Sequence, residues 1–84
     1  MKNSPLKTSI SVVIPVYNSQ ESLSPLLERL FDTLPELADH YEVILINDGS
    51  RDDSWQIIQQ MTQQYPALVG INLMRNYGQH NAIL

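Results

Sequence analysis

"YEVILINDGSRDD" (41–53) passes directly from an apolar run into a loop with three carboxylates, an amide, a glycine and a serine. Short runs rich in valine and isoleucine, nearly continuous rather than alternating, are typical of strands that a parallel sheet buries on both faces. Two more such runs flank it, ISVVIPV (10–16) and VGINLM (69–74). The sequence therefore predicts three strands, the second of which ends in an acidic loop.

A helical pattern fills the gap between the first two runs. Its apolar residues form one stripe with spacings of three and four, and they are Leu23, Leu26, Leu27, Leu30, Phe31 and Leu34. A proline costs about 3 kcal/mol inside a helix but little in its first turn. Pro25 therefore predicts a helix that begins near Ser22 or Ser24, after a loop. Pro35 predicts the end of this helix.

A second helix is predicted before the third run. Its apolar side carries Ile57, Ile58, Met61 and Tyr65. Ser50 with Asp53 three residues later resembles a capping box. Asp52 and Asp53 also suit the positive end of a helix. Pro66 predicts where the helix ends.

The elements alternate as strand, helix, strand, helix, strand. Right-handed crossovers then give a Rossmann-like α/β fold, a three-stranded parallel sheet with flanking helices. A chain of 84 residues suffices for one small domain. We expect an N-terminal tail over residues 1–8 and this domain over residues 9–84.

The composition excludes several classes of protein. Five basic residues stand against nine acidic ones, without a basic stripe, so we expect no nucleic-acid partner. The chain has no cysteine, which excludes disulfides and thiolate metal sites. No stretch has the form of a signal peptide, and no run approaches the roughly 18 apolar residues of a membrane span. We therefore expect this segment to be soluble.

Polar loops follow all three predicted strands. They are PVYNSQE (15–21), NDGSRDD (47–53) and MRNYGQH (74–80). Ligands of open parallel sheets bind outside the carboxyl ends of the strands, so the loops together predict a binding site at one edge. Each also has a purely structural interpretation, because Asp48 and Gly49 suit a turn and the following acids suit a helix start.

Three common site types are excluded. His80 has no partner at metal-ligand spacing except the distant His40, so no zinc site is predicted. The first strand is not followed by Gly-x-Gly-x-x-Gly, and the chain holds no Gly-Lys-Ser/Thr phosphate-binding motif. Classical dinucleotide binding and P-loop chemistry are therefore not expected.

Three segments together resemble the amino-terminal part of inverting family-2 glycosyltransferases. They are VVIPVYNSQESL (12–23), VILINDGSRDDSW (43–55) and NLMRNYGQHNAIL (72–84). The third is similar to the branch that transfers a sugar from a nucleotide onto a polyprenyl phosphate. That branch includes bactoprenol glucosyltransferases, dolichol-phosphate mannose synthases and the undecaprenyl-phosphate aminoarabinose transferase. The resemblance implies the first part of a GT-A type nucleotide-sugar-binding domain.

The family pattern after the first strand is Pro-x-Tyr-Asn-Glu, which this chain matches at Pro15, Tyr17 and Asn18. Ser19 stands where the acid usually lies, and Glu21 brings a carboxylate two positions later. By resemblance we expect Pro15 and Tyr17 to contact the nucleotide. Ser19 and Glu21 are further candidates.

The family pattern after the second strand is Asp-Asp-Gly-Ser, with Asn47 here in place of the first acid. The resemblance assigns base recognition to Asp48, and an ionised carboxylate suits a base that presents N–H donors, such as uracil at N3. It also places Arg75 near the nucleotide. Asn47 and Gly78 are further candidates. Both UDP- and GDP-linked sugars remain open as donors.

In the family, an Asp-x-Asp motif holds Mg²⁺ or Mn²⁺ on the diphosphate, and a catalytic carboxylate lies later still. Neither occurs in these 84 residues. We therefore expect no catalytic residue and no metal ligand here, and no transferase activity from the chain alone. For the full-length enzyme the resemblance implies a polyprenyl phosphate acceptor and a place on the cytoplasmic side of the inner membrane.

A competing hypothesis is a flavodoxin-like module that binds a small ligand or accepts a phosphoryl group. It requires acids from two strand ends and a lysine after a later strand, whereas only Asp48 is well placed. A third hypothesis is a structural fragment that binds nothing.

In the family the strand order begins 3-2-1, and a later strand pairs on the free side of the first. These 84 residues do not include that later strand, so we expect the first strand to lie at an edge of the sheet. That strand is long, apolar and uncharged, and such an edge invites pairing with another chain. We therefore expect a homo-oligomer or a swapped dimer rather than a monomer.

Overall fold

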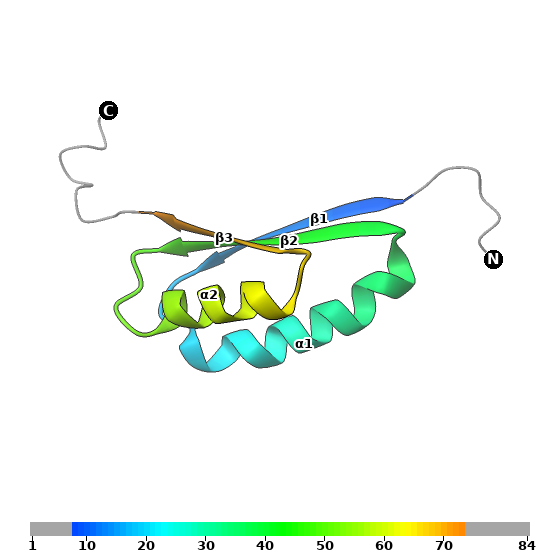
Figure 1. Ribbon diagram of the computed structural model, residues 1–84. Coiled ribbons are helices and arrows are strands. Elements are labelled where there is room, and N and C mark those ends of the chain that lie inside the picture. The colour runs from blue at the N-terminus through cyan, green and yellow to red at the C-terminus, as the bar shows by residue number, and fades with distance from the viewer. Residues whose placement is uncertain (1–7, 74–84) are drawn as a thin grey trace, which may run out of the picture.

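A computed structural model describes residues 8–73 of the chain (Figure 1). Its elements are β1 (Ser9–Val16), α1 (Gln20–Leu37), β2 (His40–Asp48), α2 (Ser54–Gln64) and β3 (Leu68–Leu73). The strands form one parallel sheet in the order β1-β2-β3. The predicted α/β fold and its alternating order of elements are confirmed.

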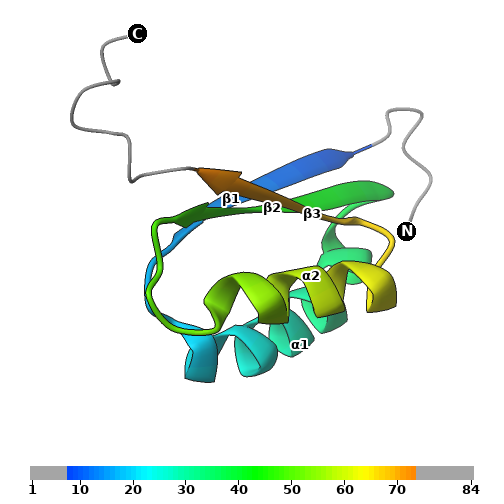
Figure 2. The same cartoon turned by 60° about the vertical axis from the view of Figure 1, so that its left-hand side comes forward.

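Both helices cover the same face of the sheet, as Figures 1 and 2 show. Each new strand is added next to the previous one, in the order β1, β2, β3. Because both connections are expected to be right-handed, their helices lie on the same face of the sheet. The expectation that these strands are buried on both faces is therefore wrong for residues 8–73. Along β1, exposed residues alternate with more buried ones instead.

The core lies between the sheet and the two helices. Its buried apolar residues are Val16, Leu23, Leu27, Leu34, Val43, Leu45, Ile58 and Leu68. The stripe predicted for α1 supplies three of them, whereas Leu26 remains 37% exposed. Helix α2 approaches β3 closely at Gly70, where an added Cβ would lie 2.5 Å from Cγ2 of Ile58. Glycine at this strand position lets the helix and the sheet come together.

Helix α1 begins earlier and ends later than its prolines predict. It starts at Gln20 rather than near Ser22 or Ser24, and it continues past Pro35 to Leu37. Pro25, in the second turn, removes one N–H that would bond to a carbonyl four residues earlier. Hydrogen bonds from the neighbouring helix hold the first turn in place, as described below.

Helix α2 begins at Ser54, with Asp53 as its N-cap residue and no cap hydrogen bond from that side chain. The predicted capping box of Ser50 and Asp53 is therefore wrong. Ser50 lies in the preceding loop, where its hydroxyl joins a different network. The predicted end before Pro66 is confirmed, because Tyr65 is the C-cap residue.

The face of the sheet away from the helices is open among the described residues. Its exposed apolar side chains include Val13, Val69, Ile71 and Leu73. The register aligns Val13 with Ile44 and Ile44 with Val69, which makes an apolar row across all three strands. Neither of the two described helices is long and apolar enough to cross a bilayer.

Candidate nucleotide-binding edge

The loops that follow β1 and β2 meet at the carboxyl edge of the sheet. The register pairs Val16 with Asn47, so the next residues, Tyr17 and Asp48, leave neighbouring strand ends. Tyr17 is 57% exposed and Asp48 is half-buried. The structure thus brings two of the predicted site residues to one edge.

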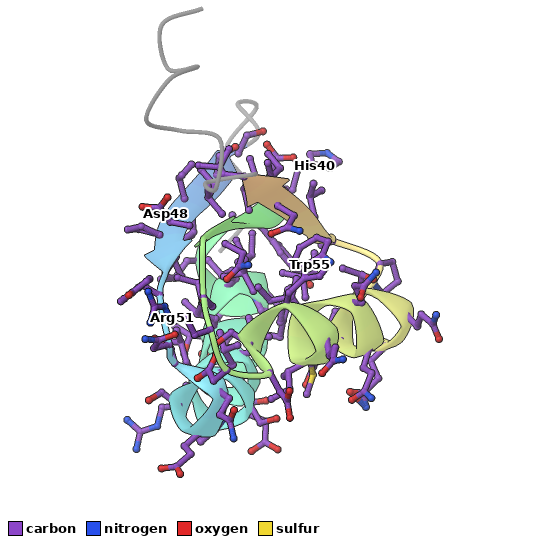
Figure 3. The ribbon with its side chains drawn as sticks, turned by 90° about the vertical axis from the view of Figure 1, so that its left-hand side faces the viewer. His40, Asp48, Arg51 and Trp55 are labelled. Carbon is purple, nitrogen blue, oxygen red and sulfur yellow. The ribbon has the colours of Figure 1, made fainter. Side chains whose placement is uncertain are left out.

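Asp48 and Asn47 point to opposite faces, because successive side chains of a strand alternate. Asn47 is only 3% exposed and lies on the helix side. Figure 3 shows Asp48 on the other side of the sheet, away from α2, and Trp55 between α2 and the sheet. Pro15, also predicted at the site, is exposed and lies on the open face two residues before Tyr17.

Two hydrogen bonds join the β1–α1 loop to the β2–α2 loop. The Asn18 N–H donates to Ser50 Oγ at 2.9 Å, and the Arg51 N–H donates to Asn18 Oδ1 at 2.7 Å. Asn18 has φ 46°, a left-handed conformation that asparagine tolerates better than most residues. Gly49, with φ 74°, makes the turn after β2, as predicted for it. The two loops therefore hold each other in a defined shape.

An amide pair extends this network to β3. Asn47 Nδ2–H donates to Asn72 Oδ1 at 2.8 Å, and Ser50 Oγ–H donates to Asn47 Oδ1. Both polar ends of the buried Asn47 side chain are thereby satisfied. Residues at the ends of all three strands belong to one continuous network.

The first turns of the two helices cap each other. The Ser19 N–H donates to Ser54 Oγ at 2.9 Å, and the Gln20 N–H donates to Asp52 Oδ2 at 3.2 Å. In return, the Asp53 N–H donates to Gln20 Oε1 at 2.9 Å. These contacts satisfy N–H groups that a helix start leaves without an intrahelical partner.

Asp52 is the centre of this helix junction. Its Oδ1 accepts the Ser54 hydroxyl at 2.6 Å and the Ser54 N–H at 2.9 Å. These bonds favour the ionised form, so the Ser54 hydroxyl above all, with the backbone N–H groups of Ser54 and Gln20, lowers the pKa of Asp52 below its usual value. Asp52 therefore serves the fold at the helix starts.

A polar hollow of about 460 Å³ lies beside the start of α1. Its lining residues are Asn18, Ser19, Gln20, Glu21, Ser22 and Asp52. Two further predicted candidates, Ser19 and Glu21, thus border it. The Ser19 hydroxyl donates to the Tyr17 carbonyl at 2.9 Å, which fixes the turn after β1.

Two predicted site residues, Arg75 and Gly78, lie outside the described residues. Sequence reasoning missed Asn72 and Ser54 as members of the edge. Asn72 is a polar residue within an apolar run, which is a visible signal, but its alignment with Asn47 depends on the strand register. Ser54 resembles an ordinary helix-start serine until the packing of the two helices is known.

No group of three or more histidine, aspartate or glutamate side chains among residues 8–73 is arranged to hold a metal ion. Aspartates 48, 52 and 53 are close in sequence, yet Asp52 is directed to the helix junction by Ser54 and Gln20. Residues 8–73 therefore present no cluster of acids and histidines that fits a metal ion.

Comparison with known proteins finds one matching family model and a group of relatives that share one name. The family model described as glycosyl transferase family 2 matches residues 11–84. A protein of Shewanella sediminis named undecaprenyl-phosphate 4-deoxy-4-formamido-L-arabinose transferase is 50% identical over 89% of this chain and 23% of its own length. Proteins of the same name from Aeromonas hydrophila and Pseudomonas fluorescens are 48% and 49% identical over 100% and 89% of this chain, and over 26% and 22% of their own lengths. The chain thus spans about a quarter of the length of these curated relatives.

Proposed function

The chain belongs to glycosyl transferase family 2, and we propose that it forms the nucleotide-binding part of an enzyme that transfers a sugar from a nucleotide onto a polyprenyl phosphate. The names of the relatives support the polyprenyl phosphate acceptor. The observation that carries the proposal is the carboxyl edge of the sheet, where Tyr17 and Asp48 leave adjacent strands and hydrogen bonds fix both loops.

Asp48 recognises the base in this proposal. An ionised carboxylate only accepts hydrogen bonds, so it suits the N–H groups of uracil or guanine. Tyr17 and Pro15 lie on the neighbouring strand end, where they form the wall beside the base. By the family resemblance, Arg75, which follows β3 in the sequence and lies outside the described residues, is a further candidate for contact with the nucleotide.

We propose that the chemical step belongs to parts of the enzyme outside this chain, because the chain spans only about a quarter of the length of its relatives. A divalent cation, Mg²⁺ or Mn²⁺, would stabilise the negative charge that develops on the departing diphosphate. The residues described in this chain would bind and orient the donor and would hold neither the metal nor the catalytic base. The 84-residue chain therefore has no transferase activity by itself. By the family resemblance, we propose that the longer enzyme works on the cytoplasmic side of the inner membrane.

The phosphoacceptor alternative has less support. It requires carboxylates that converge from two strand ends, and Asp52, the acid nearest to Asp48 in the loop, is turned to the Ser54 and Gln20 N–H groups. Residues 8–73 bring no second strand-end acid beside Asp48.

A titration followed by nuclear magnetic resonance tests the proposal. Uridine diphosphate and guanosine diphosphate would be added in turn to the isotope-labelled 84-residue chain, with ribose 5-phosphate as the control for a sugar phosphate that lacks a base. We expect one diphosphate to shift the amide signals of Tyr17 and Asp48, while those in the middle of α1 stay in place. Absence of any saturable shift with both diphosphates would argue against nucleotide binding by this chain.

A further inference from the structure

The amide pair at the ends of β2 and β3 has a precise arrangement. Asn47 and Asn72 stand directly opposite each other in the parallel register, and their side chains are joined at 2.8 Å. Asn47 is 3% exposed and Asn72 is exposed. A polar side chain that is nearly completely buried costs stability unless it is hydrogen-bonded. Asn72 supplies the acceptor that Asn47 Nδ2 needs.

The pair is the start of a directed series of hydrogen bonds. Ser50 donates its hydroxyl to Asn47 and accepts the N–H of Asn18 at 2.9 Å. Asn18 in turn accepts the Arg51 N–H at 2.7 Å. Hydrogen bonds therefore link Asn72 on β3, through the end of β2, to the loop after β1.

The chemistry of the pair requires an amide at position 47. Asn47 donates through Nδ2 and accepts through Oδ1 at the same time. A carboxylate there would only accept, so Asn72 would have to turn its own NH₂ toward it, and a charge would be buried. The asparagine that replaces an acid of the family pattern is thus matched to its neutral partner on β3.

Resting on the proposed nucleotide binding, we propose that Asn47 and Asn72 are positioning residues for Asp48 and Tyr17. Asn47 directly precedes Asp48, so anchoring its side chain on the helix side fixes the direction in which Asp48 leaves the opposite face. The continuation through Ser50 and Asn18 sets the loop that carries Tyr17. In this role the pair acts by holding the edge in its binding shape, whereas Asp48 and Tyr17 provide the contacts with the nucleotide.

Two substitutions at the exposed member of the pair test this role. Asn72→Ala removes the acceptor, whereas Asn72→Asp keeps an oxygen for the Asn47 amide. Hydrogen exchange of the Asn18 and Arg51 amides would be measured without ligand in the 84-residue chain, together with affinities for uridine and guanosine diphosphate. Thermal unfolding would show that each variant still folds cooperatively.

We expect Asn72→Ala to speed exchange at Asn18 and Arg51 and to weaken nucleotide binding, each about two- to tenfold, as the loss of one hydrogen bond predicts. Asn72→Asp should restore the exchange rates, which are measured without ligand, to near those of the parent. Unchanged exchange in Asn72→Ala, or equally fast exchange in both variants, would overturn the positioning role. A parent chain that bound neither diphosphate would overturn the proposed function, while the exchange data would separately decide whether the pair couples the loops.

Discussion

The hydroxyl of Ser54 accepts the backbone N–H of Ser19 at 2.9 Å, so the first residue of α2 caps the start of α1. Ser54 is completely buried at this junction. The contact joins residues that are 35 positions apart and explains how α1 begins at Gln20 although Pro25 follows within two turns. The helix start is determined by packing between helices more than by the local sequence.

The first prediction concerns this junction. Ser54→Ala removes the acceptor for the Ser19 N–H and a donor to Asp52, so it should lower the free energy of unfolding by about 0.5–2 kcal/mol, the usual range for a lost helix cap. Urea denaturation measures the change. Ser22→Ala, an exposed serine in the first turn of α1, is the matched control and should change stability by less than about 0.5 kcal/mol. Equal effects of both substitutions would contradict the assigned role.

The second prediction concerns acid. The hydrogen bonds from Ser54 and Gln20 lower the pKa of folded Asp52 below 3.8. Because the folded value is depressed, the stabilisation is fully present above the unfolded pKa and is lost as the pH falls through the folded pKa. Asp52→Asn should therefore be less stable than the parent at neutral pH, with the difference shrinking below about pH 4. Unfolding midpoints between pH 7 and pH 2 measure this.

The control for this prediction is Asp53→Asn. Asp53 has the same charge and lies at the same helix start, but its side chain makes no cap hydrogen bond. We expect it to affect stability at neutral pH less than Asp52→Asn. A constant gap between Asp52→Asn and the parent over the whole pH range would contradict the linkage.

The third prediction concerns the contact between α2 and β3. Gly70→Ala would place a Cβ 2.5 Å from Cγ2 of Ile58 and 3.3 Å from Cζ3 of Trp55. We expect a loss of about 1–3 kcal/mol from overpacking, measured by chemical denaturation. In an Ile58→Leu background, which lacks the branched Cγ2, the same substitution should cost less. An unchanged cost in that background would mean that Ile58 is not the obstacle.

The fourth prediction concerns recognition of the base. Asp48→Ala should weaken binding of the preferred nucleoside diphosphate about ten- to hundredfold, the effect of losing a hydrogen bond to a charged group. Calorimetry or an NMR titration measures it. Glu36→Ala, at an exposed position near the end of α1, removes the same charge far from the edge and should leave the affinity unchanged. If both variants bound as the parent does, Asp48 would have no role in recognition.

The fifth prediction concerns association of the 84-residue chain. Val13 is 56% exposed on the open face of an edge strand, with Val69 and Ile71 on the same face. Light scattering at micromolar concentration should give a mass above 9.6 kDa that rises with concentration. Val13→Lys should shift the chain toward the monomer, whereas Leu37→Lys, at an equally exposed site on α1, should not. A constant mass of one chain would show that the face and the edge do not associate.

Much of the fold could be predicted because it rests on local patterns. Runs of valine and isoleucine predicted the three strands, and the spacing of apolar residues predicted the two helices. The structure has all five elements in the predicted order. The predicted bounds of α1 were wrong because contacts between residues far apart in the sequence determine where this helix begins and ends. Pro25 and Pro35 predicted a shorter helix because their cost was judged without the caps from α2 and the length of the packed stripe.

In the candidate site, too, some residues could be predicted from local sequence and others depend on contacts between distant segments. Tyr17 and Asp48 could be placed at one edge because parallel strands share their carboxyl ends. Asn72 could not, since its meeting with Asn47 depends on a register that is fixed by the packing of both strands. Ser50 was predicted as a helix cap and instead bonds to Asn47 and Asn18, because α2 begins only at Ser54 and Ser50 lies just after the end of β2.

The one-directional order of the strands has a consequence for how the chain acquires its structure. Among the described residues, β2 pairs with β1 and β3 pairs with β2, while α1 packs against β2 and α2 packs against β2 and β3. On a ribosome, each unit that emerges therefore finds its partner already outside the exit tunnel. We expect synthesis to proceed with β1 and β2 paired before β3 appears, so that folding advances with the growing chain from its amino terminus.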